Sequence, residues 1–249
     1  MNNQQAPLKS ISKRLKTLEE VSRKLDYTAE ARSKLNQKVN DYADQFLNEI
    51  EHSKAYYNQD VVDKDDFKPR FPEEGTSIEA LLEFYENNVN QTGLNPASGG
   101  HLGYIPGGGV YPGAMGDYLA DVTNRYGGVF FANPGAVRME NMCINWMRDM
   151  VGFPETTAGN LASGGSIANL IAIVTARDAY GIQGKHFEHS VVYLSDQVHH
   201  CVDKALRVAG MGEAVQRFIP MDSCFSMQAD HLEEQIRQDQ AQGLIPWMV

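Results

Sequence analysis

The stretch from residue 189 to residue 249 decides the fold, because buried-strand patterns alternate in it with helical patterns. The segments are HSVVYLSD (189–196), HHCVDKALRVAG (199–210), VQRFIPMD (215–222), HLEEQIRQDQAQG (231–243) and LIPWMV (244–249). The first, third and fifth are short apolar runs, and the other two have apolar residues at helical spacing. This strand–helix–strand repetition predicts a parallel sheet with covered faces, so the expected fold class is α/β.

Upstream of this stretch, helical patterns dominate. The segment ASGGSIANLIAIVTARDAYG (162–181) is a glycine turn that opens a helix, and two further helical patterns cover 117–126 and 137–150. The first sixty residues have two apolar stripes at three- and four-residue steps, one at Ile11, Leu15, Leu18, Val21 and Leu25, the other at Leu35, Val39, Tyr42, Phe46 and Ile50. These stripes predict a pair of amphipathic helices that pack on the body of the protein or on a partner subunit.

A boundary is expected near residue 95. Residues 58–77 are charged and broken by Pro69 and Pro72, which is typical of a linker. Thr76 or Ser77 then provides a cap for a short helix. From residue 95 the sequence becomes rich in glycine. We therefore expect an N-terminal helical segment at 1–95 and the main domain at 96–249.

Composition excludes several classes of protein. The 249 residues are 42% hydrophobic and 22% charged, the balance of a globular chain rather than a disordered one. A net charge of −10 disfavours a general nucleic-acid or anionic-membrane binder. No apolar run approaches the ~20 residues of a membrane span, and the start MNNQQAPLKS lacks the apolar stretch of a secretory signal. The three cysteines form no CxxC pair, which favours a reducing cytoplasm.

The turn at Gly164, Gly165 and Ser166 is the first candidate site. Glycines allow the backbone to approach a ligand closely, and a helix that begins there offers unpaired N–H groups to a phosphate. Ser166 adds a hydroxyl donor. A glycine–serine cap without any ligand is the alternative interpretation. The segment is not a P-loop, because no Gly-Lys-Ser/Thr follows, and it has no GxGxxG.

The second candidate site follows the strand pattern VVYL. Polar residues 195–199 (SDQVH) stand at the carboxyl end of a predicted parallel strand, where α/β sheets bind ligands. His199 there suits stacking on a flat cofactor, metal binding or proton transfer. The alternative is a helix cap with His199 on the helix face. We predict no metal site, because His200 points elsewhere on a helix and His186 and His189 fit a surface loop.

A third glycine-rich run, HLGYIPGGG (101–109), has no predicted strand before it, which removes a nucleotide-binding interpretation. Two interpretations of this run remain open: a loop that covers a ligand pocket, and a simple connection between two elements.

Taken in order, HLGYIPGGG…YP, NPGAVRMEN, ASGGSIANL, YLSDQVHHCVDKA and GLIPWMV closely resemble the pyridoxal-phosphate-dependent group II decarboxylases. This family includes the aromatic-amino-acid, histidine and glutamate decarboxylases and has the aspartate-aminotransferase fold, fold type I. The resemblance covers roughly residues 70–249. It implies a cytoplasmic lyase that removes the carboxylate of an L-amino acid with pyridoxal 5'-phosphate as cofactor.

The resemblance also implies roles for individual residues. The turn of Gly164, Gly165 and Ser166 would hold the cofactor phosphate, and His199 would stack on the ring and serve in catalysis. The loop with Tyr104, Pro106 and Gly107 would line the substrate pocket near a homodimer interface, where the N-terminal helices wrap the partner. The family often has a hydroxyl residue at the position of Gly107, so any contact there is expected through the backbone.

Two parts of the family pattern have no match. The family's Schiff-base lysine and ring-nitrogen aspartate come after the GLIPWMV strand, and Lys185 and Lys204, the lysines beyond residue 100, fit neither motif. We therefore expect the N-terminal half of a longer decarboxylase, with an incomplete sheet and no activity alone. Two alternatives stay open: another fold-type I enzyme, such as an aminotransferase or lyase, and a non-catalytic binding or assembly module.

Overall fold

The computed structural model describes residues 5–58, 67, 73–105 and 107–249 of the chain. The chain forms two compact units, Met1–Asn124 and Arg125–Val249, and each is described by itself. The change to glycine-rich sequence near residue 95 therefore falls inside the first unit. The expected division, with a helical segment at 1–95 and the cofactor-binding domain at 96–249, assigns functions to the two parts and stays a proposal.

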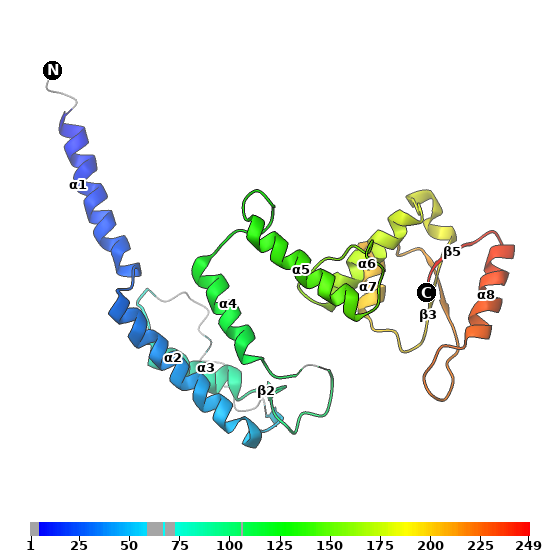
Figure 1. The fold of residues 1–249 in the computed structure, drawn as a ribbon, viewed down its shortest axis with the longest axis horizontal. Helices are drawn as coiled ribbons and strands as arrows, with labels where there is room; N and C mark the ends of the chain where they lie inside the picture. The colour runs from blue at the N-terminus through cyan, green and yellow to red at the C-terminus, as the bar shows by residue number, and fades with distance from the viewer. Residues whose placement is uncertain (1–4, 59–66, 68–72, 106) are drawn as a thin grey trace. The chain divides into compact units, whose positions relative to one another are not determined.

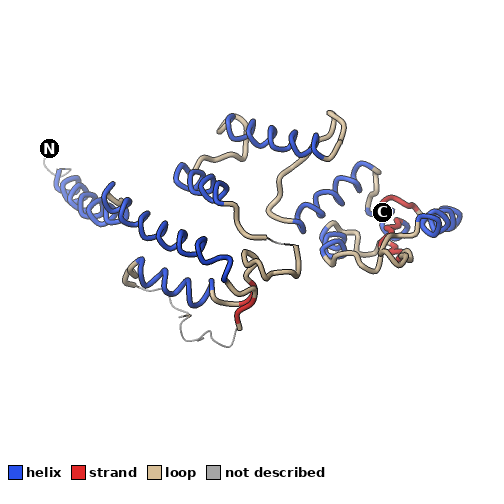
Figure 2. Tube along the Cα trace, turned by 60° about the horizontal axis from the view of Figure 1, so that its bottom comes forward, coloured by secondary structure: helices blue, strands red, loops and turns tan. Residues whose placement is uncertain are grey.

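The first unit is mostly helical. It contains α1 (Gln5–Ser22), η1 (Arg23–Leu25), α2 (Ala29–Glu49), η2 (Ile50–His52), β1 (Tyr56–Tyr57), α3 (Ile78–Tyr85), η5 (Glu86–Asn90), β2 (Gly93–Leu94) and α4 (Tyr111–Thr123). The two expected amphipathic helices are confirmed as α1 and α2. Helices α2 and α3 lie side by side (Figure 2). Strands β1 and β2 form a short antiparallel pair.

Local capping explains where these helices begin. Of the two expected caps, Ser77 is the one used, because its hydroxyl accepts the Ala80 N–H at 3.2 Å. The expected helix at 117–126 instead spans residues 111–123 as α4. A proline in its first turn explains the earlier start, because proline needs no N–H partner there. Asn124, with φ of +43°, ends the helix in the left-handed conformation.

The second unit has the expected α/β pattern. Its elements are α5 (Pro134–Met150), α6 (Gly165–Ala179), η6 (Gly184–His189), β3 (Ser190–Leu194), α7 (Cys201–Val208), β4 (Val215–Phe218), α8 (Ala229–Ala241) and β5 (Ile245–Met248). The three strands pair in parallel in the order β4-β3-β5. Val191 lies opposite Val215 on one side and Pro246 on the other. Every expected strand is confirmed, within a few residues at its ends.

The core of this unit lies on both faces of β3, whose five residues are all buried. Val192 and Leu194 face a cluster built with Leu206 of α7, Ile173 of α6 and Trp247 of β5. Helices α6 and α7 therefore cover one face of the sheet (Figure 1). On the other face, Val191 and Tyr193 pack with Ile219, and Leu232 and Ile236 of α8 close this second cluster.

A buried ion pair lies under the α8 face. Asp239 is fully buried, and Arg217 donates to its Oδ1 from Nη2 at 2.7 Å. The Tyr193 hydroxyl donates to Oδ2 at 3.0 Å. Burial by itself raises the pKa of the Asp239 carboxyl, but the hydrogen bonds from Arg217 and Tyr193 outweigh it and lower that pKa. Burial and the Asp239 carboxylate raise the pKa of the Tyr193 phenol.

The sheet is incomplete, as expected. Residues 157–163, which lead to α6, do not join it, and the described residues add no fourth strand to the three. No helix in the described ranges is long and apolar enough to cross a lipid bilayer.

Candidate functional site

The turn before α6 leaves backbone donors open. The carbonyl oxygen of Gly164 accepts the N–H groups of Ile167 and Ala168 at 3.1 and 3.0 Å, which closes the first helical turn. Within the described part of the chain, the N–H groups of Gly165 and Ser166 and the Ser166 hydroxyl have no hydrogen-bond partner. Two N–H groups and the positive end of the helix dipole therefore point out of the start of α6.

Open space surrounds this turn. A Cβ added to Gly164 or Gly165 would meet no heavy atom within 4 Å, and Gly164 has a φ of +156° that L side chains rarely adopt. The Asn169 side chain donates to the Gly165 carbonyl oxygen at 2.8 Å and so ties the second turn of α6 to the first. Among the described residues, the turn therefore combines two N–H groups without a hydrogen-bond partner and open space beside its glycines.

His199 lies in the connection between β3 and α7, because α7 begins only at Cys201. The alternative interpretation, a histidine on the helix face, is therefore wrong. The Cys201 N–H donates to His199 Nδ1 at 3.1 Å, and the His200 ring lies 4.1 Å away at an angle of 33°. Because Nδ1 accepts a hydrogen bond, Nε2 is the nitrogen that carries the proton in the neutral imidazole, and the His199 side chain is exposed.

A cavity lies at the carboxyl end of β3 between α6 and the connection that follows β3, and neither the Gly164–Ser166 turn nor His199 is among its lining residues. The cavity measures about 440 Å³, and its walls include Asn169 and Ala172 of α6 together with Ser195 and Val198 of the connection that ends in His199. Met248 of β5 also lines it. This is the position at which open parallel sheets bind ligands.

The glycine-rich loop at 101–109 belongs to the first unit. Tyr104 has a φ of +64°, is 81% exposed, and stacks on His101 with ring centroids 6.2 Å apart. Apart from its chain neighbours, no described residue has an atom within 4 Å of a Cβ added to Gly107, and Pro106 lies outside the described residues. His101 was missed by the sequence reasoning: its Nε2 is buried without a partner among the described residues. The sequence feature that could have singled out His101 is its position as the first residue of the HLGY motif.

Neither lysine beyond residue 100 lies at the cavity. Lys185 is in η6, which precedes β3 and so lies at its amino end, opposite the cavity. Lys204 is exposed on α7, whose buried face carries Cys201 and Ala205. Both fit surface positions, which agrees with the expectation from the sequence.

Of the two histidines in the loop before β3, His186 has a structural role. His186 Nδ1 accepts the Gln183 N–H at 3.2 Å and forms part of the cap of η6. Across the described ranges, no three His, Cys, Asp or Glu side chains gather in a metal-binding cluster.

Comparison with known proteins identifies the family. The pattern of the "Pyridoxal-dependent decarboxylase conserved domain" matches residues 62–249, most of the chain. The chain belongs to the pyridoxal-dependent decarboxylase family. It is 32% identical over 210 residues to the aromatic-L-amino-acid decarboxylase of Bacillus atrophaeus, which covers 83% of this chain and 43% of the relative. It is 28% identical over 230 residues to the histidine decarboxylase of Mus musculus, with 84% and 34% covered.

Solved structures of decarboxylases have the same fold as this chain. Oryza sativa TDC, crystallised with PLP and tryptamine, matches with a TM-score of 0.78 at 23% identity, over 88% of this chain and 48% of the other. Catharanthus roseus tryptophan decarboxylase with L-tryptophan matches with a TM-score of 0.78 at 19% identity, over 88% and 50%. The expected fold type I is thereby confirmed. The chain spans about half the length of these structures, and less than half of the curated relatives named above.

Pyridoxal phosphate is the cofactor of this family, and the residues present fit part of it. The open N–H groups of Gly165 and Ser166, the Ser166 hydroxyl and the free space beside them fit its phosphate. The exposed His199 ring fits a flat partner. Neither Lys185 nor Lys204 is placed to form the imine, so the fit covers the phosphate and the ring but not the covalent link.

Proposed function

We propose that this chain supplies the phosphate turn and the ring-facing histidine of a lyase that decarboxylates an L-amino acid with pyridoxal phosphate. One observation carries the proposal: α6, which begins at the open Gly164–Ser166 turn, and the connection ending in His199 border the same cavity at the carboxyl end of β3. Membership of the decarboxylase family supplies the class of reaction.

The residues of the chain divide the work as follows. When bound, pyridoxal phosphate supplies an electron-poor ring that accepts the electron pair left as carbon dioxide departs. The N–H groups of Gly165 and Ser166 and the Ser166 hydroxyl bind the phosphate, and the α6 dipole favours its charge. His199, held by the Cys201 N–H, would stack on the ring, and its Nε2–H would orient the proton donor that replaces carbon dioxide.

The loop in the first unit is proposed to meet the substrate. Tyr104 offers an exposed ring, Gly107 offers backbone groups in open space, and Pro106 is assigned with them by resemblance. The relatives named above act on aromatic amino acids and on histidine. We therefore propose an amino acid with a ring in its side chain as the substrate class to test first.

We further propose a homodimer in which the N-terminal helices pack on the partner. The apolar stripe of α1 and η1 is exposed, with Leu15 of α1 61% and Leu25 of η1 81% accessible. In the same unit, α2, α3 and α4 form an apolar groove of about 720 Å³, lined by residues such as Val39, Val110 and Tyr118. Exposed apolar surface of this extent favours a protein partner. A second copy of the chain would bury the same surface on both subunits of a symmetric dimer.

We propose the cytoplasm as the location. Cys143, Cys201 and Cys224 are all free thiols, and Cys224 is exposed, which suits a reducing compartment.

A second candidate function is a non-catalytic binding module derived from the family. The observation that favours it is the position of the two lysines, since Lys185 lies at the wrong end of β3 and Lys204 faces outward.

One experiment separates the candidates. The protein is expressed from its full reading frame, with any sequence that follows Val249, and titrated with pyridoxal phosphate while absorbance is recorded. Carbon dioxide release is then measured with aromatic amino acids, histidine and glutamate. An imine band with release from one of these supports the lyase. A band accompanied by amino-group transfer instead of release points to an aminotransferase, and no band points to the module.

A further inference from the structure

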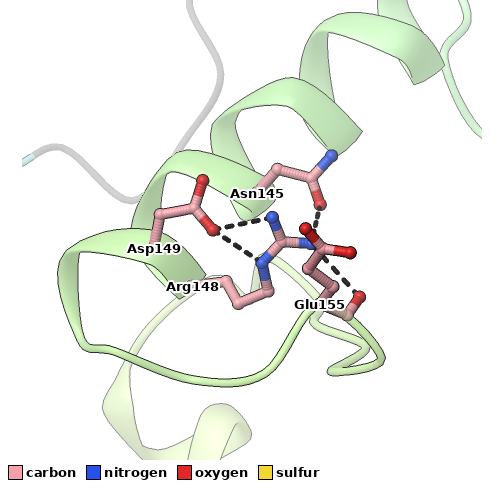
Figure 3. Close-up of polar contacts among 4 residues, drawn as sticks. All are labelled: Asn145, Arg148, Asp149 and Glu155. Carbon is pink, nitrogen blue, oxygen red and sulfur yellow. Dashed lines mark hydrogen bonds and ion pairs between the residues drawn. The ribbon is translucent and has the colours of Figure 1, made fainter.

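Arg148 joins the end of α5 to the segment that leads into the cofactor turn (Figure 3). Its Nη1 donates to the carbonyl oxygen of Glu155 at 3.3 Å and to Asn145 Oδ1 at 3.2 Å. Its Nε and Nη2 both donate to Asp149 Oδ1, at 2.8 and 2.7 Å. The Arg148 side chain is only 16% exposed. A guanidinium held by three partners keeps one orientation, so it fixes Glu155 beside the helix.

The same segment meets α5 at a second point. A Cβ added to Gly159 would lie 2.6 Å from Cγ2 of Ile144, so only glycine fits this approach without movement. Ile144 and Arg148 are four residues apart and therefore neighbours on one side of α5. The chain between Glu155 and Gly159 thus runs along that side, hydrogen-bonded at Glu155 and closely packed on α5 at Gly159.

The start of this segment is also fixed. The Phe153 N–H donates to the Arg148 carbonyl oxygen at 3.0 Å, and Gly152, with φ of +74°, turns the chain back at the end of α5. After Gly159 only a short stretch remains before Gly164, where the turn begins. The position of the turn donors therefore depends on where Arg148 and Gly159 hold the segment.

We infer that Arg148 is a positioning residue for the cofactor phosphate. It holds residues 152–163 against α5 so that the N–H groups of Gly165 and Ser166 meet the phosphate in one fixed arrangement, and it does not itself contact the cofactor. Arg148 lies outside the glycine–serine and SDQVH motifs, which is why sequence reasoning missed it. This inference rests on the proposed function.

The test compares two ligands that differ only in the phosphate. Dissociation constants for pyridoxal phosphate and for pyridoxal are measured by equilibrium dialysis on the full-reading-frame protein and its Arg148→Ala and Arg148→Lys variants. For Arg148→Ala we expect pyridoxal phosphate to bind about five- to tenfold more weakly, the effect of about one hydrogen bond, while pyridoxal binds unchanged. Lysine keeps a donor for Glu155 but not the fork to Asp149, so Arg148→Lys is expected to fall between.

Two further variants, one a control and one a second test, accompany the Arg148 substitutions. Arg138→Ala removes the same side chain from the same helix, where Arg138 stacks on Phe130 with 5.4 Å to the ring centroid, and is expected to change neither constant. Gly159→Ala disturbs the second attachment and is expected to weaken pyridoxal phosphate selectively, which keeps the test available if Arg148→Ala does not fold. Equal weakening of both ligands, or of neither, would overturn the inference.

The proposed function fails in a different way. If the unmodified protein does not bind pyridoxal phosphate, or if Ser166→Ala leaves its affinity unchanged, the phosphate turn itself is wrong and the inference falls with it. If Ser166→Ala weakens binding but Arg148→Ala and Gly159→Ala do not, the turn stands and only the role of Arg148 is refuted.

Discussion

The Tyr193 hydroxyl donates to Oδ2 of Asp239 at 3.0 Å, and both side chains are fully buried between β3 and α8. Arg217, one-third exposed, completes the cluster from β4. Three elements that are distant in the sequence therefore meet at one carboxylate. The cluster lies on the face of the sheet opposite α6 and α7 and ties α8 to β3 and β4.

Asp239→Asn is expected to destabilise the second unit by about 3 kcal/mol at neutral pH, because Arg217 loses its charged partner. The pKa of Asp239 is lowered in the folded state, so its contribution is present above the usual carboxyl pKa of about 4 and is lost as pH falls through the lowered value. The difference between the two proteins should shrink below about pH 4. Urea unfolding followed by tryptophan fluorescence measures it, since Trp146 and Trp247 both lie in the second unit.

Two comparisons test this account of Asp239. Tyr193→Phe removes one hydrogen bond and should cost about 1 kcal/mol. Glu234→Gln changes an exposed carboxylate on the same helix and should stay within about 0.5 kcal/mol. An Asp239→Asn penalty that persists undiminished in acid would show that the ion pair is not its source.

Ser166→Ala in the full-reading-frame protein is expected to weaken pyridoxal phosphate binding by about 1.5–3 kcal/mol, the worth of one hydrogen bond to a charged group. The apo protein should keep its thermal stability, because Ser166 is exposed and its hydroxyl has no partner within the described residues. Ser163→Ala deletes the same group from the loop just before the turn and should have little effect. Equal loss in both variants would place the phosphate elsewhere.

His199→Ala is expected to lower kcat for decarboxylation far more than His200→Ala does. The reason is that His199 is oriented by the Cys201 N–H with Nε2 free, whereas the motif resemblance gives His200 no role. Steady-state carbon dioxide release at saturating cofactor measures the difference. A similar loss in both variants, or a loss in His200→Ala alone, would shift the register of the site by one residue.

The 249-residue polypeptide by itself is expected to form no imine with pyridoxal phosphate and to release no carbon dioxide. Lys185 lies at the amino end of β3 and Lys204 points away from the core, so neither reaches the cavity. Absorbance titration of the isolated chain is the measurement. An imine band that disappears in Lys204→Ala but not in Lys185→Ala would identify Lys204 as the covalent residue and refute this assignment.

Val110→Asp is expected to weaken the proposed homodimer at least tenfold by placing a charge in the apolar groove of the first unit. Val110 is 72% exposed and is the N-cap of α4, where aspartate is favourable, so the fold should tolerate the change. Phe225→Asp is the control, because Phe225 is 74% exposed in the second unit with φ of +61°, which aspartate accepts. Analytical ultracentrifugation compares them, and an unchanged dimer in Val110→Asp would exclude the groove.

Much of the fold follows from local pattern. The alternation of VVYL, VQRF and IPWM with helical segments predicts the parallel strands, because buried strands and amphipathic helices space their apolar residues differently. Ser77 as a cap and the amphipathic stripe of α1 are likewise visible in the sequence. The order SGGS then SDQVH indicates the candidate site, since both motifs combine residue types that suit a phosphate and a flat ring.

Other features depend on contacts between residues that are distant along the chain, which no local pattern encodes. The strand order β4-β3-β5, the meeting of Asp239 with Tyr193 and Arg217, and the attachment of Glu155 to Arg148 are of this kind. So is the placement of His199 before α7, where the Cys201 N–H selects which nitrogen accepts. The sequence alone determined which residue types stand at the turn and at the strand end. Only the tertiary structure decided that α6 and the connection after β3 border one cavity, because sheet pairing and helix packing bring them together.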